Sequence, residues 1–214
     1  MLQWAKITEG IYFASPNEFL VNLYVSSTVS WERSDATVVI QQTSELPNKA
    51  AVSFAVADIV PRKAVERGGD DVSVFDFLLH VPYWAIGNMT VTVNGVVHAF
   101  EDSQAPRWYR LPGKWQKGDS VGLQLPISIH AAPIGDDSTV NAIMYGPLVL
   151  VGLTNSTAAF TVAPSQVGGC FQADPSSLTF RSLPNCMLGG ASLRFKPLFA
   201  VVNENYGMYW QFLW

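Results

Sequence analysis

Three histidines and two cysteines are the side chains of this sequence that could bind a metal or act as base and nucleophile. His80, His98 and His130 are dispersed through predicted strands, which favours surface or hydrogen-bonded roles over metal binding. Cys170 and Cys186 could form one bridge or remain a pair of buried thiols. The sequence contains no H-E-x-x-H, C-x-x-C, G-x-S-x-G, Walker-type phosphate loop or G-x-G-x-x-G motif. We therefore assign no catalytic residue and no metal ligand.

Adjacent acidic residues are the next candidates for chemistry, and they occur at Asp70-Asp71, Glu101-Asp102 and Asp136-Asp137. Carboxyl-based hydrolysis of sugars needs two groups that face each other across the substrate, one protonated and one ionised. Neighbouring carboxylates on loops do not reach that arrangement by themselves. Turn formation explains them more simply, because Asp bonds its own backbone and Gly supplies positive φ. A calcium site built from the same loop oxygens is the alternative.

Aromatic side chains near predicted strand ends form the remaining candidate site. They are Trp84, Trp108, Tyr109 and Trp115. Exposed rings of this kind stack on the C–H face of a sugar or fill an interface between domains. Half-buried packing within the domain is the simpler alternative for any single ring. The pattern alone does not separate contact with a glycan from contact with another domain.

The elements that must position these residues are strands. Short β-branched and aromatic runs, separated by Gly, Pro, Asn and Asp, dominate the chain, and helical periodicity is almost absent. Alternating Thr and Val in residues 90–93, followed by Asn94-Gly95, predict a hairpin with a type I′ turn. The strands expected in the first part of the chain span residues 10–13, 20–26, 37–42, 51–57, 74–80, 90–93, 108–111 and 120–125.

Two β units are expected within an all-β fold. The first is an antiparallel, jelly-roll-like β-sandwich over residues 1–130, and the second is a smaller β-sandwich unit over residues 131–214. An apolar strand pair is expected around the Gly146-Pro147 break. Residues 154–190 are rich in Ser, Thr, Pro and Gly and predict only short strands, and β character returns at residues 191–199 and 206–214.

Composition narrows the class of protein. The chain has 214 residues, of which 49% are hydrophobic and 14% are charged, so it can bury a sizeable core and is not globally disordered. The formal net charge of −4 and the absence of a basic run argue against nucleic acid as the main partner. The longest apolar stretch is too short to span a bilayer. We therefore expect a globular protein with neither a nucleic-acid partner nor a membrane span.

Signals for the cellular compartment are mixed. The first residues lack the charged segment, apolar segment and cleavage site of a signal peptide, so nothing in them predicts export. Two N-x-S/T sequons, at Asn88 and Asn155, would fit a secretory route, although such tripeptides often arise by chance. The sequence leaves the compartment open, and it does not say whether Met1 is a true start.

Several short segments carry a family resemblance when they are taken in order. They are Ile11-Tyr12-Phe13, Leu23-Tyr24-Val25, Gln41-Gln42-Thr43, residues 77–84, Val91-Thr92-Val93-Asn94-Gly95, Arg110 with Trp115, Gly118 and Asp119, residues 142–150, and residues 205–210. This series resembles the region that follows the catalytic barrel in glycoside hydrolase family 127, the β-L-arabinofuranosidase-like enzymes. His80 and Asn205 stand where that family usually has arginine, and residues 62–71 resemble a glycine-rich insertion.

The resemblance implies what this chain lacks as well as what it contains. In that family an (α/α)6 barrel carries the acid carboxylate and a zinc-bound cysteine nucleophile, with adjacent cysteines near the end of the barrel. Cys170 and Cys186 lie far downstream and are not adjacent, so neither role is carried over to them. The resemblance therefore implies no cofactor in this chain, the zinc belonging to the barrel, and predicts that the chain alone is inactive.

Two classes of function follow as hypotheses. The first is a non-catalytic accessory region that braces the barrel, shapes its substrate cleft or forms a homodimer interface, with the barrel of a longer polypeptide as partner. The second is a free-standing carbohydrate-binding module or an orphan interaction domain, for which an arabinose-containing glycan is the expected ligand of the aromatic set. The sequence does not identify the sugar or its linkage.

Overall fold

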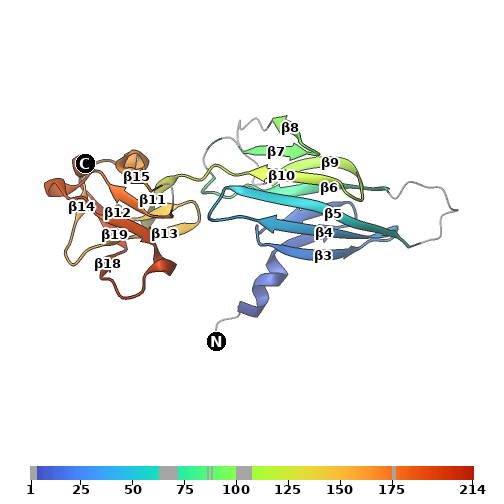
Figure 1. Cartoon of the computed structure of the whole chain (residues 1–214), viewed down its shortest axis with the longest axis horizontal. Coiled ribbons are helices and arrows are strands. Elements are labelled where there is room, and N and C mark those ends of the chain that lie inside the picture. The colour runs from blue at the N-terminus through green and yellow to red at the C-terminus, as the bar shows by residue number, and fades with distance from the viewer. Residues whose placement is uncertain (1–3, 63–71, 86, 88, 100–107, 175–176) are drawn as a thin grey trace. The chain divides into compact units, whose positions relative to one another are not determined.

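The computed structural model describes residues 4–62, 72–85, 87, 89–99, 108–174 and 177–214. The chain divides into two compact units, Met1–Pro126 and Ile127–Trp214, whereas the sequence placed the boundary after residue 130. Both units consist of strands and short 3-10 turns (Figure 1), so the all-β class expected from the sequence is confirmed. Among the described residues, no helix has the length and apolar character needed to cross a bilayer.

The first unit contains two sheets, preceded by the 3-10 helix η1 (Trp4–Gly10). The four-stranded sheet has the order β1 (Tyr12–Ser15), β2 (Glu18–Val21), β6 (Val72–His80) and β9 (Trp108–Gln116). The six-stranded sheet has the order β3 (Ser27–Glu32), β4 (Ala36–Ser44), β5 (Ala51–Pro61), β10 (Ser120–Gln124), β7 (Thr90–Val93) and β8 (Val96–Ala99).

Aromatic rings from the two sheets form the core between them. Phe19 of β2 lies 5.5 Å from Trp31 of β3, and Phe77 of β6 lies 6.1 Å from Phe54 of β5, as ring-centroid distances. These rings are buried, and the residues beside them along each strand point outward. The alternation that predicted half-buried strands therefore produces a β-sandwich.

Two details of the first unit differ from the expectation. The strands are not all antiparallel, because β2 runs parallel to β6 with Glu18 opposite Asp76 and Val21 opposite Leu79. Alternation determines which face a strand buries, and it does not determine the direction of the neighbouring strand. The single strand expected over residues 20–26 is also wrong, since β2 ends at Val21 and β3 begins at Ser27.

The hairpin between β7 and β8 has the predicted turn. Asn94 has φ of 49° and Gly95 has φ of 81°, and Val93 pairs with Val96. A type I′ turn needs positive φ at both central residues, which Asn tolerates and Gly adopts freely. The prediction from the Asn-Gly pair is confirmed.

The second unit is built on one nine-stranded sheet. Its main path has the order β14 (Ala159–Phe160), β19 (Tyr209–Phe212), β12 (Asp137–Tyr145), β13 (Leu148–Leu153), β17 (Arg194–Pro197), β16 (Phe180–Ser182) and β15 (Phe171–Ala173). Two further strands join it, β11 (Ile129–Ile134) on β12 and β18 (Tyr206–Gly207) on β13. The 3-10 turns are η2 (Pro164–Cys170), η3 (Pro184–Cys186), η4 (Leu188–Gly190) and η5 (Leu198–Ala200).

This sheet curls until its two ends meet. Phe160 lies in β14 at one end of the strand order and Phe171 lies in β15 at the other, yet their ring centroids are 5.9 Å apart. Phe160 also contacts Phe212 and Trp210 in the same buried cluster. A single curled sheet therefore encloses the core that the sequence predicted between two sheets. The expected strand pair around Gly146-Pro147 is present as β12 and β13, with Tyr145 opposite Leu148.

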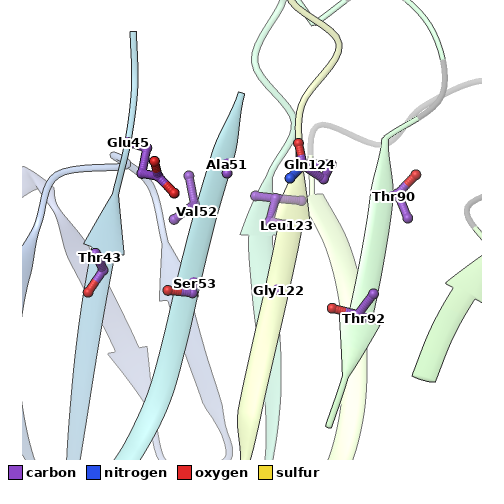
Figure 2. Close-up of a pocket in the computed structure, with 10 residues that line it drawn as sticks. All are labelled: Thr43, Glu45, Ala51, Val52, Ser53, Thr90, Thr92, Gly122, Leu123 and Gln124. Carbon is purple, nitrogen blue, oxygen red and sulfur yellow. The ribbon is translucent and has the colours of Figure 1, made fainter. Parts of the chain in front are cut away.

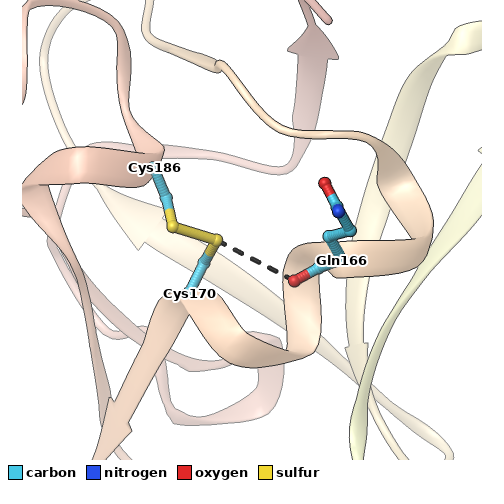
Figure 3. The surroundings of a disulfide bond; sticks show 3 residues. All are labelled: Gln166, Cys170 and Cys186. Carbon is cyan, nitrogen blue, oxygen red and sulfur yellow. Dashed lines mark hydrogen bonds between the residues drawn. A yellow bond between two sulfur atoms is a disulfide. The ribbon is translucent and has the colours of Figure 1, made fainter.

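The two cysteines form a disulfide, which decides between the alternatives left open by the sequence. Cys170 ends η2 and Cys186 ends η3, with their Cα atoms 5.7 Å apart (Figure 3). Both side chains are buried in the core cluster of the second unit. The bridge joins two irregular segments that share few strand hydrogen bonds.

Candidate functional site: a hydroxyl-lined groove on the first unit

The four aromatic residues singled out in the sequence do not share one surface. Trp115 is 2% exposed and its Nε1 donates a hydrogen bond to the Phe75 carbonyl oxygen at 2.9 Å, so it belongs to the core. Trp84 is also buried. Trp108 and Tyr109 are partly exposed at the start of β9, and as consecutive strand residues they point to opposite faces of the sheet. Contact of these aromatic residues with a glycan or with another domain stays a prediction. Because Trp84 and Trp115 are buried, it applies only to Trp108 and Tyr109.

Trp108 and Tyr109 have different surroundings. The Trp108 ring lies 5.2 Å from the ring of His80, its partner on β6. Tyr109 pairs with Leu79, whose side chain is fully buried, and burial raises the pKa of the Tyr109 hydroxyl. Trp108 thus lies against another aromatic ring, whereas the Tyr109 hydroxyl is in a partly desolvated environment.

The candidate acidic and histidine residues do not form a metal or catalytic cluster among the described residues. No group of three or more His, Cys, Asp or Glu side chains lies close enough to hold a metal in this part of the chain. Asp137 accepts hydrogen bonds from the backbone and side chain of Thr139, which lowers the pKa of its carboxyl and fits the predicted turn role. Asp70-Asp71 and Glu101-Asp102 lie outside the described residues.

Residues of the family-like motifs hold turns together in the first unit. The Asn94 amide nitrogen donates to Asp119 Oδ1 at 2.9 Å, and Asn94 Oδ1 accepts from the Ser120 backbone nitrogen at 2.8 Å. Asp119 Oδ2 accepts from the Gln116 backbone nitrogen at 2.8 Å. These bonds tie the β7–β8 turn to the β9–β10 turn. The Asn-Gly and Gly-Asp motifs are therefore structural in this chain.

A second set of motif residues fixes the segment between β2 and β3. Gln42 Nε2 donates to the Leu23 carbonyl oxygen at 3.1 Å and to the Val25 carbonyl oxygen. The Tyr24 hydroxyl donates to the His80 carbonyl oxygen, and burial raises the pKa of that hydroxyl. Most buried polar groups in proteins are paired in this way. These motif residues act on the fold.

The groove on the outer face of the six-stranded sheet is the best candidate for ligand binding in this unit (Figure 2). Its volume is about 320 Å³. One row of outward residues crosses four strands in register, Thr43 opposite Ser53, Ser53 opposite Gly122, and Gly122 opposite Thr92. A neighbouring row contains Ala51, Gln124 and Thr90, and Glu45 closes one end.

Gly122 lies in the middle of the row, between Ser53 and Thr92. A Cβ atom at this position would lie 2.5 Å from Thr92 Oγ1, so any larger residue would displace that hydroxyl. The space that a side chain at Gly122 would take is therefore partly filled by the Thr92 hydroxyl. Gly122 and Thr92 thus belong to one row of small residues that lines the groove.

The groove offers binding chemistry and no reaction chemistry. Hydroxyl and amide groups both donate and accept hydrogen bonds, which suits a neutral ligand rich in hydroxyls. Among the described residues that line it, Glu45 is the one carboxylate, and it pairs with Lys49 at 2.5 Å. The lining residues that the structure describes do not combine a nucleophile with a base.

Sequence reasoning missed this groove. The signal that could have found it is a polar residue next to a buried one in three strands: Thr43 beside Gln42, Ser53 beside Val52, and Thr92 beside Val91. Thr43 lies just after the strand predicted over residues 37–42. Those positions become one row only once the strand order and register are known.

The described residues form a β-sandwich unit followed by a curled-sheet unit, and motif residues hold the turns of the first unit together. Residues 18–127, just over half of the chain, match the family described as "Beta-L-arabinofuranosidase, GH127 middle domain". The chain belongs to this family through that middle domain. Among proteins of curated function, none matches the sequence.

Solved structures share the fold of nearly the whole chain. A GH127 β-L-arabinofuranosidase from Geobacillus stearothermophilus T6 is similar over 97% of the chain, with a TM-score of 0.68 and 17% identity. A second GH127 β-arabinofuranosidase is similar over 94%, with a TM-score of 0.66 and 16% identity. The chain spans 36% and 35% of the lengths of these two structures, respectively. At this level of identity the likeness shows the fold alone.

Proposed function

We propose that this chain is a non-catalytic β region that supports the catalytic barrel of a family 127 enzyme. The observation that carries the proposal is that the family match falls on the middle domain, over residues 18–127. The two structures with the same fold are arabinofuranosidases and are much longer than this chain. The barrel is the partner, and the β region braces it, shapes one side of its cleft or joins two copies of the enzyme.

The outer face of the four-stranded sheet supports a bracing role. Phe13 is 50% exposed and Val74 is 58% exposed on this sheet. Beside them, Arg110 pairs with both Glu18 and Asp76 at 2.5 Å, which fixes the charged part of the face. Apolar area next to paired charges is typical of an interface between domains.

In the first experiment, the transcript upstream of the Met1 codon is sequenced and the same genome is searched for a gene that encodes a family 127 barrel. The purified barrel protein is mixed with the full chain, and the mixture is analysed by size-exclusion chromatography with light scattering. We expect a one-to-one complex, a β-L-arabinofuranosidase activity that requires the barrel, and no activity of the chain alone. Turnover by the chain alone that increases with its concentration, or no complex with any such barrel, would contradict the proposal.

A matched pair of variants tests whether the outer face of the four-stranded sheet contacts the barrel. Val74→Glu places a charge on the outer face of β6, whereas Val96→Glu places one at an equally exposed position on β8 of the other sheet. We expect the first to weaken the complex at least tenfold, because the contact would have to desolvate the added carboxylate together with Lys114, which is opposite position 74. The second should leave binding unchanged. The reverse result would move the contact to the six-stranded sheet.

A carbohydrate-binding role is the second candidate, and the groove of Figure 2 favours it. Calorimetric titration of the full chain with arabino-oligosaccharides tests it. Thr92→Val should reduce this binding. Thr28→Val, which lies outside the groove on β3, should leave it unchanged. This pair of results would support the role. No heat at millimolar ligand would count against it.

A further inference from the structure

A pair of arginines on the second unit stands out by its position. Arg181 of β16 and Arg194 of β17 are directly opposite each other in the antiparallel register. Both are exposed, whereas Phe180 and Phe195 beside them are buried and also face each other. The two guanidinium groups therefore extend from the same face of the sheet at neighbouring positions.

These two arginines lack an ion-pair partner among the described residues. The second unit holds three cations, and the third, Lys196, pairs with Glu204. No described side chain forms an ion pair or hydrogen bond with Arg181 or Arg194. Like charges directly opposite each other destabilise a sheet. The fold itself gains nothing from this placement.

Both arginines line one pocket, which has a volume of about 360 Å³. Gln172 of β15 is opposite Arg181, so an amide and two guanidinium groups form one row across three strands. Thr179 and Asp174 complete the polar part of the lining, and the Thr179 hydroxyl donates to Asp174 Oδ2 at 3.5 Å. The pocket is thus rich in hydrogen-bond donors and small enough for one sugar-sized ligand.

We propose that this pocket binds a carboxylate-bearing ligand, such as a sugar acid, between Arg181 and Arg194. Arginine presents paired N–H groups that match the two oxygens of a carboxylate or phosphate. Two arginines and one aspartate leave the lining with a single net positive charge. A singly charged carboxylate neutralises that charge, whereas a doubly charged phosphate would leave an excess negative charge beside Asp174. The site lies outside the matched middle domain and does not depend on the proposed support of a barrel.

Titration of the full chain with sodium glucuronate, glucose and inorganic phosphate tests the proposal by NMR or calorimetry at low salt. We expect saturable binding of glucuronate in the millimolar range or tighter, no binding of glucose, and weaker binding of phosphate. Arg181→Gln and Arg194→Gln should each reduce the affinity for glucuronate at least tenfold. Raising the salt concentration should weaken it as well.

Two further measurements separate a binding role from a structural one. Asp174→Asn should raise the affinity for phosphate more than that for glucuronate, because it removes the charge that opposes a dianion. Without ligand, Arg181→Gln should leave the Tm of the second unit unchanged or raise it, since it removes a like-charge contact. Glucuronate binding that survives both arginine substitutions, tighter binding of phosphate, or a Tm lowered by Arg181→Gln would overturn the proposal.

Discussion

The two units of this chain reach a packed core by different means. The first places aromatic rings from two sheets against each other and ties its turns with side-chain hydrogen bonds such as that between Asn94 and Asp119. The second curls one sheet around Phe160 and joins two irregular segments through Cys170 and Cys186. The first unit is held by long paired strands, whereas the segment between residues 154 and 190 has short strands and is constrained by the bridge.

The largest effect should come from truncating the ring at the centre of the first core. Phe77 is fully buried and contacts Phe19, Phe54 and Trp115. Phe77→Ala should lower the free energy of unfolding of the first unit by about 3–5 kcal/mol. Calorimetry, with limited proteolysis to identify which unit opens, measures this loss.

The control for this substitution is on the same strand. Val74→Ala removes an outward side chain and should change stability by no more than about 0.5 kcal/mol. The second unit, which has its own core, should keep its transition in both variants. If Phe77→Ala shifted both transitions equally, the two units would unfold together. Their different cores would then not give them separate stabilities.

The regular parts of the fold follow from the sequence because local chemistry determines them. Asn94-Gly95 dictates its turn, and alternation around Phe75 and Phe77 dictates which face β6 buries. The parallel contact of β2 with β6 and the curl that brings Phe160 to Phe171 depend on partners distant in the chain. No local pattern encodes such partners, so they appear only in the structure.

The candidate sites also divide into features that local sequence indicates and features that depend on distant strands. Trp84 and Trp115 have the residue type expected of a binding surface, yet they are buried, because ring type does not report which face of a strand is covered. The groove around Gly122 and the pocket between Arg181 and Arg194 arise from cross-strand register. Asn155, the sequon within the described residues, is exposed and accepts a hydrogen bond from the Asn205 amide at 2.8 Å, whereas Asn88 lies outside them.

Removal of the disulfide should have the next largest effect, and only on the second unit. The bridge closes a loop with a sequence separation of 16 residues, for which constraint of the unfolded chain gives about 3 kcal/mol. Cys170→Ala combined with Cys186→Ala should lower the Tm of the second unit, and a reducing agent should do the same to the unmodified protein.

The first unit is the internal control for the disulfide, because it contains no cysteine. Its transition should not respond to a reducing agent. A double variant with an unchanged second transition would show that the curled sheet is stable without the bridge, and the comparison between the units would then rest on packing alone.

The lock between two turns of the first unit should have a smaller effect. Asp119 is largely buried and accepts from Asn94 and from the Gln116 backbone nitrogen. Asp119→Ala leaves both donors without this acceptor and should cost about 1–3 kcal/mol. Asp119→Asn keeps one acceptor oxygen and should cost less. Equal losses for the two variants, measured by urea unfolding, would mean that charge and not hydrogen bonding stabilises the lock.

The smallest effect should be the loss of stability of the second unit at acid pH. Lys196 donates a hydrogen bond to Glu204, and the Val202 backbone nitrogen donates to the same carboxylate, which together lower the pKa of Glu204 from 4.5 to about 2. A lowered folded-state pKa means that the unfolded chain binds the proton more readily. The stabilisation is therefore complete above the unfolded pKa and is lost as the pH falls from about 4.5 towards 2. Since Glu204 is exposed to solvent, the change should be small and should shrink further in high salt. Unfolding of the second unit by urea at pH 6 and pH 3 measures the slope, and Glu204→Gln should flatten it; an identical slope in the variant would assign the acid sensitivity to other carboxylates.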